Sequence, residues 1–235
     1  MYNLFEGVYS MKTIIITGAG SGLGKELAFL FSQKGDHLLL TGRTSEKLNA
    51  VKQEIETSGG TADILPLDIR NNEDVVNKIK EISSTYEIFG LVNNAGIGHF
   101  GPFTNMNEQQ ISEVLETNVL GTILMTKAIL PVLEQNGQGQ IMNIISTAGL
   151  RGKVNEAVYV ASKFAVRGFI ESLQKEYEGS GIKFNAVYMG GMNTPFWDES
   201  HHIKDKSRLR SAREIAEIIM GQLDRDSIII ENKNS

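Results

Sequence analysis

The chain has 235 residues, 41% of them hydrophobic, and a formal net charge of −5. This length suits one domain, although it could hold two small ones. The mild acidity and the absence of a basic block argue against nucleic acid and anionic membranes as partners. The absence of cysteine excludes disulfides, thiol nucleophiles and cysteine-based metal sites.

No apolar run approaches the ~20 residues needed to span a bilayer, and residues 1–10 lack the features of a signal peptide. We therefore expect a cytoplasmic protein. Residues 1–10 are predicted to be an extension: an upstream start, a cloning remnant or a flexible arm. The histidines lack metal-site spacing, so no metal is expected, and the pair His201–His202 is expected to face solvent.

Strand-like and helix-like segments alternate along the chain. Short apolar runs predict strands at residues 13–17, 37–41, 62–67, 88–93, 140–145, 183–188 and 227–230. Amphipathic stretches predict helices at residues 22–34, 45–57, 72–84, 107–134, 155–178 and 212–223. Strands separated by helices imply parallel pairing through right-handed crossovers. The prediction is one doubly wound, Rossmann-like α/β domain over residues 11–235, with both faces of the sheet covered.

A glycine-rich turn joins the first predicted strand to the first predicted helix. Such a turn lets the backbone approach a pyrophosphate, and the helix N-terminus adds free N–H groups and partial positive charge. The spacing T-G-x-x-x-G-x-G differs from the commoner G-x-G-x-x-G, so a tight structural turn is the alternative. The candidate cofactor contacts here are Gly18, Ser21, Gly22, Leu23 and Gly24.

The second predicted strand is followed by Arg43 and Thr44. NAD-binding folds usually place a carboxylate near this point to hold the ribose 2′-hydroxyl. An arginine instead holds a 2′-phosphate through charge-assisted hydrogen bonds. These two residues are therefore candidate cofactor contacts that favour NADP(H) over NAD(H). The alternative is a solvated arginine on a loop.

Polar residues and a glycine follow the third and fourth predicted strands. Asp68 is placed to accept a hydrogen bond from an adenine amino group, or to cap the helix that begins near residue 72. Asn94 and Ala95 follow the fourth strand, where asparagine favours turns, and Gly96 permits close backbone approach. All four are candidate cofactor contacts.

Asn118 lies among apolar residues in the middle of a predicted helix. Asparagine is a mediocre helix former and, if buried, needs hydrogen-bond partners. One interpretation is a water bridge between Asn118 and Lys163 that would give a proton path to solvent. The other is a core asparagine bonded to backbone.

Tyr159 and Lys163 are four positions apart on a predicted helix and share a face, while Ser146 ends the preceding apolar strand. A free tyrosine has a pKa of about 10, which a nearby ammonium lowers. Tyr159 is then expected to act as general acid or base on a carbonyl or alcohol oxygen. Ser146 would hydrogen-bond the same oxygen, and Lys163 would bind the nicotinamide ribose.

Together these motifs resemble the short-chain dehydrogenases/reductases, from about residue 12 to about residue 230. In that resemblance Asn118, Ser146, Tyr159 and Lys163 match the catalytic tetrad, and Asp68 and Asn93–Gly96 match cofactor motifs. The family implies a seven-stranded parallel sheet in the order 3-2-1-4-5-6-7 and NAD(P)-dependent interconversion of an alcohol and a carbonyl. Arg43 goes with NADP preference in the same pattern.

One segment departs from the family pattern. Met189 replaces the usual proline after the sixth strand, which is expected to leave that loop less rigid. Gly190, Met192 and Thr194 are still predicted to contact the cofactor. A short substrate lid is expected at about residues 195–210, giving a pocket that is open or closes only on binding. The expected pocket residues are His99, Leu150, Val154, Tyr188, Met189, Phe196 and Trp197.

The predicted helix 155–178 carries two apolar or small stripes, which indicates a second burial partner. One stripe contains Ala157, Ala161, Ala165 and Phe169; the other contains Val160, Phe164 and Gly168. We therefore expect a homodimer or homotetramer that pairs through this helix and the preceding long one.

The function expected from the sequence is an NADP(H)-dependent oxidoreductase acting on a small-molecule carbonyl or secondary alcohol. A catalytically idle dinucleotide-binding regulator is the alternative. A sugar-nucleotide epimerase is disfavoured by the glycine spacing and the short C-terminal part.

Overall fold

The computed structural model describes residues 11–197, 202 and 209–232. Its main sheet contains β1 (Thr13–Thr17), β2 (His37–Gly42), β3 (Thr61–Pro66), β4 (Ile88–Asn93), β5 (Gly139–Ile144), β6 (Ile182–Met189) and β9 (Ser227–Ile230). The α-helices are α1 (Gly22–Gln33), α2 (Ser45–Thr57), α3 (Asn72–Ser83), α4 (Glu108–Leu115), α5 (Gly121–Asn136), α6 (Ala157–Glu176) and α7 (Ala212–Met220). A separate two-stranded pair joins β7 (Met192–Asn193) to β8 (Arg210–Ser211).

The sheet has seven strands in the order β3-β2-β1-β4-β5-β6-β9, and every hydrogen-bonded neighbour is parallel. Each parallel neighbour along the chain is reached by a crossover that carries a helix, as the alternating pattern predicts. The predicted fold and strand order are therefore confirmed, with β9 as the seventh strand.

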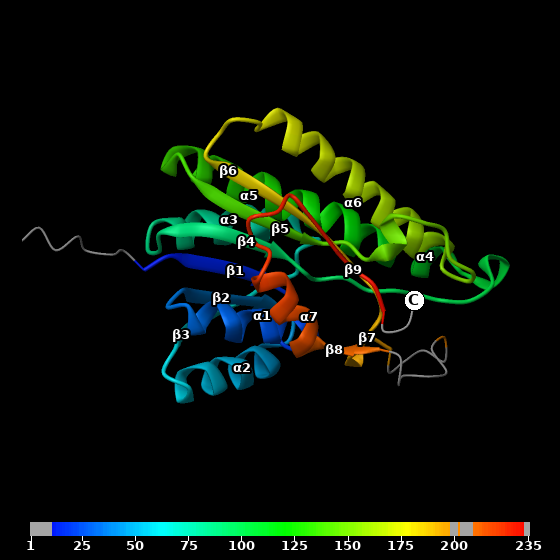
Figure 1. Cartoon of the computed structure of the whole chain (residues 1–235), viewed down its shortest axis with the longest axis horizontal. Coiled ribbons are helices and arrows are strands. Elements are labelled where there is room, and N and C mark those ends of the chain that lie inside the picture. The colour runs from blue at the N-terminus through cyan, green and yellow to red at the C-terminus, as the bar shows by residue number, and fades with distance from the viewer. Residues whose placement is uncertain (1–10, 198–201, 203–208, 233–235) are drawn as a thin grey trace, which may run out of the picture.

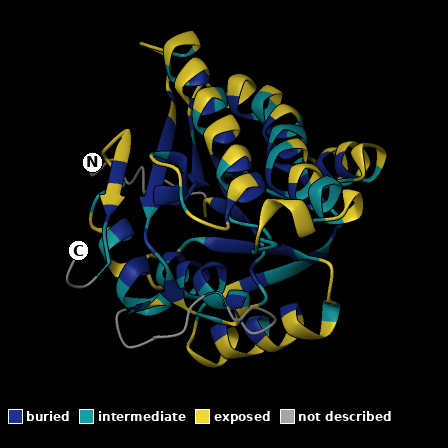
Figure 2. Ribbon diagram, turned by 90° about the vertical axis from the view of Figure 1, so that its right-hand side faces the viewer, coloured by how far each residue is buried: buried dark blue, intermediate teal, exposed yellow. Residues whose placement is uncertain are grey.

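Helices cover both faces of the sheet, so its strands are apolar on both sides. In β1, Ile14 and Ile16 join a core with α1, α2 and α7, whereas Ile15 joins a core with α3, α5 and α6. Figure 1 shows these two helix layers on either side of the sheet. Figure 2 shows the buried strands between helices whose outer faces are exposed. Complete burial of each such isoleucine stabilises the fold by roughly 1.5–3 kcal/mol.

The predicted helix 107–134 is a continuous rod with an irregular centre. Between α4 and α5 the segment Glu116–Leu120 forms a π-helical turn. The Thr122 hydroxyl donates a hydrogen bond to the Asn118 carbonyl at 2.9 Å, one turn back along the rod. Such insertions cluster at functional sites, because they redirect side chains without ending the helix. The turn contains Asn118, the residue singled out from the sequence.

Some expectations fall on residues outside the described part of the chain. These are the extension at residues 1–10, His201, and most of the expected lid, residues 198–201 and 203–208. Within the described ranges, no helix combines the length and apolar character needed to cross a membrane. The cytoplasmic location stays a prediction. Across the same ranges, no three His, Asp or Glu side chains gather as a metal site.

Candidate active site

The glycine turn after β1 forms a backbone cradle at the start of α1. Gly18 and Gly22 have positive φ angles of 66° and 55°, which favour glycine. A Cβ atom on Gly24 would lie 2.5 Å from the Gly18 carbonyl oxygen, so any side chain there would displace the turn. Helix α1 begins after Ser21 without a side-chain cap and without an acidic residue in its first turn. Its first N–H groups are therefore placed to bind an anion.

Ser21 and Leu23 differ in what they offer a cofactor. Ser21 is exposed at the helix start, whereas the Leu23 side chain is 3% exposed and belongs to the core. Only the backbone of Leu23 is available to a ligand. Thr194 also borders this cradle, since a Cβ on Gly22 would lie 3.5 Å from its side chain. The structure thus brings the loop after β6 against the start of α1.

The ends of β1 and β4 are tied together by Asn94 and its neighbours. The backbone N–H groups of Asn94 and Ala95 donate to the Thr17 hydroxyl at 2.9 and 3.0 Å. The Asn94 amide donates to the Thr17 carbonyl at 2.9 Å. The Asn93 amide instead donates to Thr126 and Asn143 in the core, both at 3.0 Å. These bonds fix the loop that carries Gly96.

Arg43 and Thr44 are exposed just after β2, where the sequence predicts a 2′-phosphate contact. Asp68 lies on the neighbouring loop and accepts hydrogen bonds from the Arg70 guanidinium at 2.6–3.1 Å. These bonds lower the pKa of Asp68, and the charge of Arg43 adds to the effect. The alternative role of Asp68 as a helix cap is wrong, because Asn71 caps α3 by accepting from the Asp74 N–H.

Ser146, Tyr159 and Lys163 come together beyond the carboxyl end of β5. Tyr159 and Lys163 lie one turn apart on the buried face of α6, and the Lys163 ammonium is 5.6 Å from the centroid of the Tyr159 ring. Lys163 donates to the Ile144 carbonyl at 3.1 Å, the last residue of β5. The Ser146 hydroxyl lies close enough to Tyr159 to lower its pKa. The three predicted residues therefore form one cluster.

Ser146 adopts an unfavourable backbone conformation. Its φ of 105° lies in a region that only glycine enters easily, at a cost of about 1–3 kcal/mol. The conformation is held by hydrogen bonds from the N–H groups of Ile145 and Ser146 to the Val187 carbonyl, at 2.8 and 3.3 Å. Backbone strain of this kind is concentrated at functional sites, where a side chain must be held in one orientation.

Burial dominates the ionisation of the cluster. Burial raises the pKa of Tyr159; the nearby Ser146 hydroxyl opposes this rise, and the negative charge of Glu156 adds to it. Burial also lowers the pKa of Lys163 to about 8. The expectation that the ammonium lowers the tyrosine pKa is therefore wrong for the protein alone. In this state the cluster keeps Tyr159 protonated, the form needed to donate a proton.

Asn118 is a buried asparagine bonded to protein groups. Its side chain accepts from the Ile97 N–H at 2.8 Å and donates to the Ile97 carbonyl at 2.9 Å and the Ser162 hydroxyl at 3.0 Å. It also borders Lys163, because a Cβ on Gly96 would lie 3.2 Å from the Asn118 Oδ1 and 3.6 Å from the Lys163 Nζ. The π-helical turn thus anchors the loop after β4 beside the lysine.

The loop after β6 is held by the C-terminal residues. The Gly190 N–H donates to the Ile230 carbonyl at 2.8 Å, and a Cβ on Gly190 would lie 2.2 Å from the Asn232 Oδ1. Glu231 receives two hydrogen bonds from the Arg151 guanidinium at 3.0 and 2.8 Å. Met192 is buried in β7 and pairs with β8. The C-terminal segment therefore supports two loops that border the cluster.

An aromatic group surrounds Tyr159, and only part of it was expected from the sequence. Phe196 lies 6.0 Å from the Tyr159 ring, and Phe100, which sequence reasoning missed, lies 5.5 Å from it. Trp197 stacks on Phe100 at 5.0 Å. Two His-to-Glu contacts complete this region: His99 bonds Glu113, and His202 bonds Glu156, both at 2.9 Å.

Several pocket expectations need correction. Tyr188 is 4% exposed and belongs to the core beneath α3, α5 and α6, while Met189 and Leu150 pack against the cores. Val154 is 83% exposed and faces solvent. The expected solvent exposure of His202 is wrong, because its ring stacks on Phe100 and bonds Glu156. An aromatic or histidine in a glycine-rich loop gives no periodic signal from which such contacts could be predicted.

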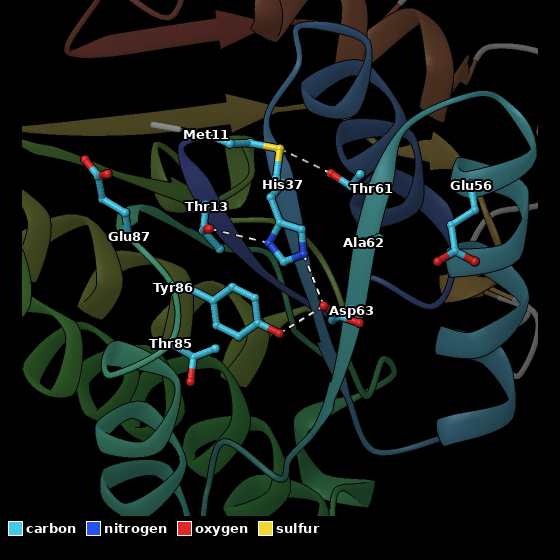
Figure 3. A pocket seen from close by; sticks show the side chains of 10 residues that line it. All are labelled: Met11, Thr13, His37, Glu56, Thr61, Ala62, Asp63, Thr85, Tyr86 and Glu87. Atoms are coloured by element: carbon cyan, nitrogen blue, oxygen red, sulfur yellow. Dashed lines mark hydrogen bonds and ion pairs between the residues drawn. The ribbon is translucent and has the colours of Figure 1, made fainter. Parts of the chain in front are cut away.

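A cavity of about 520 Å³ lies at the opposite end of the sheet. Figure 3 shows that its lining comes from the amino ends of β1, β2 and β3, the segment before β4, and Glu56 of α2. His37, Tyr86 and Lys52 all bond Asp63 there, at 3.2, 2.9 and 2.8 Å. The polar groups bond one another and lie away from the glycine cradle. This cavity is therefore not the candidate active site.

A doubly wound parallel sheet with a glycine cradle at the carboxyl end of β1 defines a Rossmann-like dinucleotide-binding protein. The family model described as short chain dehydrogenase matches residues 12–205. The chain therefore belongs to the short-chain dehydrogenase family, and it is an NAD(P)-dependent oxidoreductase.

Relatives of known name agree with this assignment. The sepiapterin reductase of Chlorobaculum tepidum is 31% identical over 192 residues, which cover 78% of this chain and 79% of the relative. A putative NAD(P)-dependent gluconate 5-dehydrogenase from Beutenbergia cavernae, solved with bound NADP, is 26% identical with a TM-score of 0.85. The similarity covers 95% of each chain. Other similar structures were solved with NADPH, as in Sphingobium yanoikuyae, or with NAD, as in Burkholderia phymatum.

Proposed function

We propose that this protein interconverts a small-molecule carbonyl and its secondary alcohol with NADP(H), using Tyr159 as the general acid or base. The observation that carries the proposal is the meeting of Ser146, Tyr159 and Lys163 at the same edge of the sheet as the glycine cradle. In open α/β sheets, ligands bind at the carboxyl ends of the strands, where the strand order reverses. Here that reversal lies between β1 and β4.

The residues present fit a dinucleotide. Gly18, Gly22 and Gly24 leave the backbone bare at the start of α1, where a pyrophosphate is stabilised by free N–H groups. Lys163 and the loop at Gly96 would border the nicotinamide ribose, and Asp68 the adenine. When bound, NADP(H) supplies or accepts the hydride.

Tyr159 would donate its proton to the carbonyl oxygen as that oxygen becomes an alkoxide, and remove it in the reverse direction. General acid catalysis of this kind contributes roughly 10²–10⁴-fold. Ser146 would hydrogen-bond the same oxygen from a side chain already aimed by its fixed backbone. Lys163 would stabilise the phenolate through its charge after the proton has moved. Asn118 holds the loop after β4 against Lys163 and so keeps the ammonium in place.

Arg43 supports the preference for NADP(H). It is exposed beside β2, and Asp68 already carries Arg70 as an ion-pair partner at 2.6 Å. A guanidinium next to the ribose edge recognises a 2′-phosphate bidentately, whereas NAD selection rests on a carboxylate at the end of β2. Relatives solved with NADP are compatible with this choice.

The decisive test is Tyr159→Phe, which removes the hydroxyl and keeps the ring. Turnover of NADPH with a panel of aldehydes and ketones is expected to fall by about 10³-fold or more, while NADPH still binds in a fluorescence titration. Undiminished turnover would refute the role of Tyr159. A wild-type protein that binds NADPH but reduces no member of the panel would favour the idle regulator.

We also propose that the protein works as a homodimer or homotetramer. Most members of the two stripes of α6 face outward in the single chain: Ala157, Ala161, Ala165, Phe164 and Gly168 are exposed, and Phe164 is 42% exposed. Of the other two, Val160 is half-buried and Phe169 packs against the core. On the neighbouring rod, Leu115 and Leu120 are 40% and 44% exposed. Contact between two copies of this face would bury both sets. Light scattering that gave a mass near 25.9 kDa at micromolar concentration would contradict this.

A further inference from the structure

Glu156 is a buried carboxylate one turn before Tyr159. Its residue is 6% exposed, and although it occupies the N-cap position of α6, its side chain makes no capping bond. Its negative charge raises the pKa of Tyr159 and so opposes the phenolate that catalysis must form. Burying a carboxylate is costly unless it is paired. Helix capping does not explain why a carboxylate is buried here. The group that pairs with Glu156 therefore indicates what this carboxylate can bind.

The partner of Glu156 is the imidazole ring of His202. The His202 Nε2 lies 2.9 Å from the Glu156 Oε1, and the His202 ring stacks on Phe100 at 4.9 Å with an interplanar angle of 14°. Phe100 in turn contacts the Tyr159 ring edge-on at 5.5 Å. The face of Phe100 and the Glu156 carboxylate therefore flank one planar nitrogen heterocycle, the His202 ring, and Phe100 connects this ring to Tyr159.

This arrangement is held by the backbone. The Gly101 N–H donates to the Asn155 carbonyl at 2.9 Å, which ties the loop of Phe100 to the residue before Glu156. Asn155 has a φ of 62°, a left-handed conformation that asparagine tolerates better than most residues. Trp197 adds a second aromatic face, stacked on Phe100 at 5.0 Å. Aromatic faces and the carboxylate thus stand at fixed positions beside Tyr159.

We propose that Glu156 is the substrate-recognition residue of this site and that the substrate is a planar nitrogen heterocycle bearing a carbonyl. Its ring N–H or amino group would donate to Glu156 in place of the His202 ring, its face would stack on Phe100, and its carbonyl would meet Tyr159. The proposal rests on the proposed function. The carbonyl carbon gains a hydride from NADPH, the oxygen gains the Tyr159 proton, and the products are the alcohol and NADP⁺, with the tyrosine proton restored from solvent.

Recognition of this kind would also assist the chemistry. A donor that faces Glu156 offsets the negative charge beside Tyr159, and a nearby compensated carboxylate disfavours the phenolate less than an isolated one. A substrate without the donor would have to displace the His202 ring and would leave the Glu156 carboxylate without a hydrogen-bond donor in its place. The site would therefore discriminate by the donor as well as by shape, as sites that hydrogen-bond a substrate group do.

The test compares isatin with N-methylisatin as substrates for NADPH oxidation by the full-length protein. Both are planar and carry the same ketone, but only isatin has a ring N–H. A hydrogen bond to a charged group predicts that kcat/KM for isatin exceeds that for N-methylisatin by about 10- to 100-fold. Equal values for the two compounds would overturn the proposal while leaving the proposed function intact.

Variants assign the preference to Glu156. In Glu156→Leu the isatin preference is expected to fall to about twofold or less, and Glu156→Gln, which keeps the shape, should give an intermediate ratio. His202→Ala should retain the preference and lower KM for isatin, because the competing ring is gone. Glu217→Gln, on the exposed side of α7 and paired with Arg213, is the matched control and should behave as wild type.

These outcomes distinguish a failure of the Glu156 proposal from a failure of the proposed function. A preference that persists in a folded Glu156→Leu protein, or that disappears in His202→Ala, would contradict the role of Glu156. If the Glu156 variants do not fold, the isatin to N-methylisatin ratio of the wild-type protein decides alone. Failure of the wild-type protein to reduce either compound or any simple aldehyde would overturn the proposed function and this inference together.

Discussion

The two ends of the parallel sheet treat polar groups in opposite ways. At the amino ends of the strands, Asp63 accepts hydrogen bonds from His37, Tyr86 and Lys52, and the His37 and Tyr86 rings stack at 4.9 Å (Figure 3). At the carboxyl ends, Lys163 is buried with one carbonyl partner, and burial shifts its pKa. Asp63 shares its charge with a lysine, whereas Lys163 faces a backbone carbonyl.

Asp63 at the amino end contributes to stability, whereas Lys163 and Ser146 at the carboxyl end lower stability at the proposed site of chemistry. A half-exposed charge with several partners costs the fold little, whereas a buried charge without an ionic partner costs several kcal/mol. Ser146 adds backbone strain at the same carboxyl edge. Natural proteins accept such costs where a ligand is bound or a proton is moved. The cavity at the amino end, with its closed network, is therefore the weaker candidate for chemistry despite its volume.

Lys163→Met is expected to have the largest effect of the variants that test this contrast. Turnover should fall by about 10²–10³-fold, because the phenolate loses its neighbouring cation. The fold should not suffer. With a folded-state pKa of about 8 against an ordinary 10.5, the native state binds fewer protons between these values, so stability rises as pH increases from 8 to 10.5.

Below pH 8 the buried ammonium therefore costs the fold its full amount, about 3 kcal/mol from the shift. Lys163→Met should melt no lower than the wild-type protein at neutral pH, measured by calorimetry without cofactor. A lower melting temperature would mean that Lys163 stabilises the fold, and the contrast between the two ends would fail.

Arg43→Ala should have an intermediate effect, confined to the cofactor. Loss of the guanidinium is expected to raise the dissociation constant of NADPH by about 10-fold or more, with NADH binding almost unchanged. Isothermal titration with both nucleotides measures this. Equal losses for the two would show that Arg43 does not recognise the 2′-phosphate.

Asp63→Asn should have the smallest effect and touch only stability. Partial burial alone would raise the pKa of Asp63, but hydrogen bonds from Lys52 and Tyr86 hold it below the ordinary value of about 3.8. Because this carboxylate is 41% exposed, its loss should cost only about 1 kcal/mol. That corresponds to a melting temperature lower by roughly 2–4 °C, with turnover unchanged.

The sign of its pH dependence follows from the lowered pKa. Stability from Asp63 is complete above about pH 3.8 and is lost as pH falls through the lower folded-state value. The difference between wild type and Asp63→Asn should therefore shrink in acid. Glu54→Gln, which breaks the exposed pair with Lys25, is the control and should show almost no change. A large loss of turnover in Asp63→Asn would overturn the division between the two ends.

Periodicity and spacing were enough to predict most of the fold and the central cluster. Alternating apolar runs specify the parallel sheet, because every buried strand must be apolar on both faces. The separation of Tyr159 from Lys163 places both on one face of α6. These relations depend on local geometry, which follows directly from the order of the residues in the sequence.

Other contacts depend on packing between distant segments. Phe100 reaches Tyr159 and His202 only after three segments far apart in the sequence converge, and no spacing rule encodes that meeting. The π-helical turn at Asn118 also escaped prediction, because an inserted backbone residue leaves the apolar pattern nearly unchanged. The rise in the Tyr159 pKa depends on how completely the fold removes water, which sequence spacing does not report.

The close contact between Gly190 and Asn232 has a practical consequence for protein engineering. Any side chain introduced at Gly190 would displace Asn232 and the segment that supports the loop bordering the cofactor cradle. Because the same segment also holds Arg151 through Glu231, a change there would reach both sides of the cluster of Ser146, Tyr159 and Lys163. Immobilisation for biocatalysis or biosensing is therefore better made through the exposed side chains near the C-terminal end of α2, such as Gln53 and Glu56, which lie toward the opposite edge of the sheet.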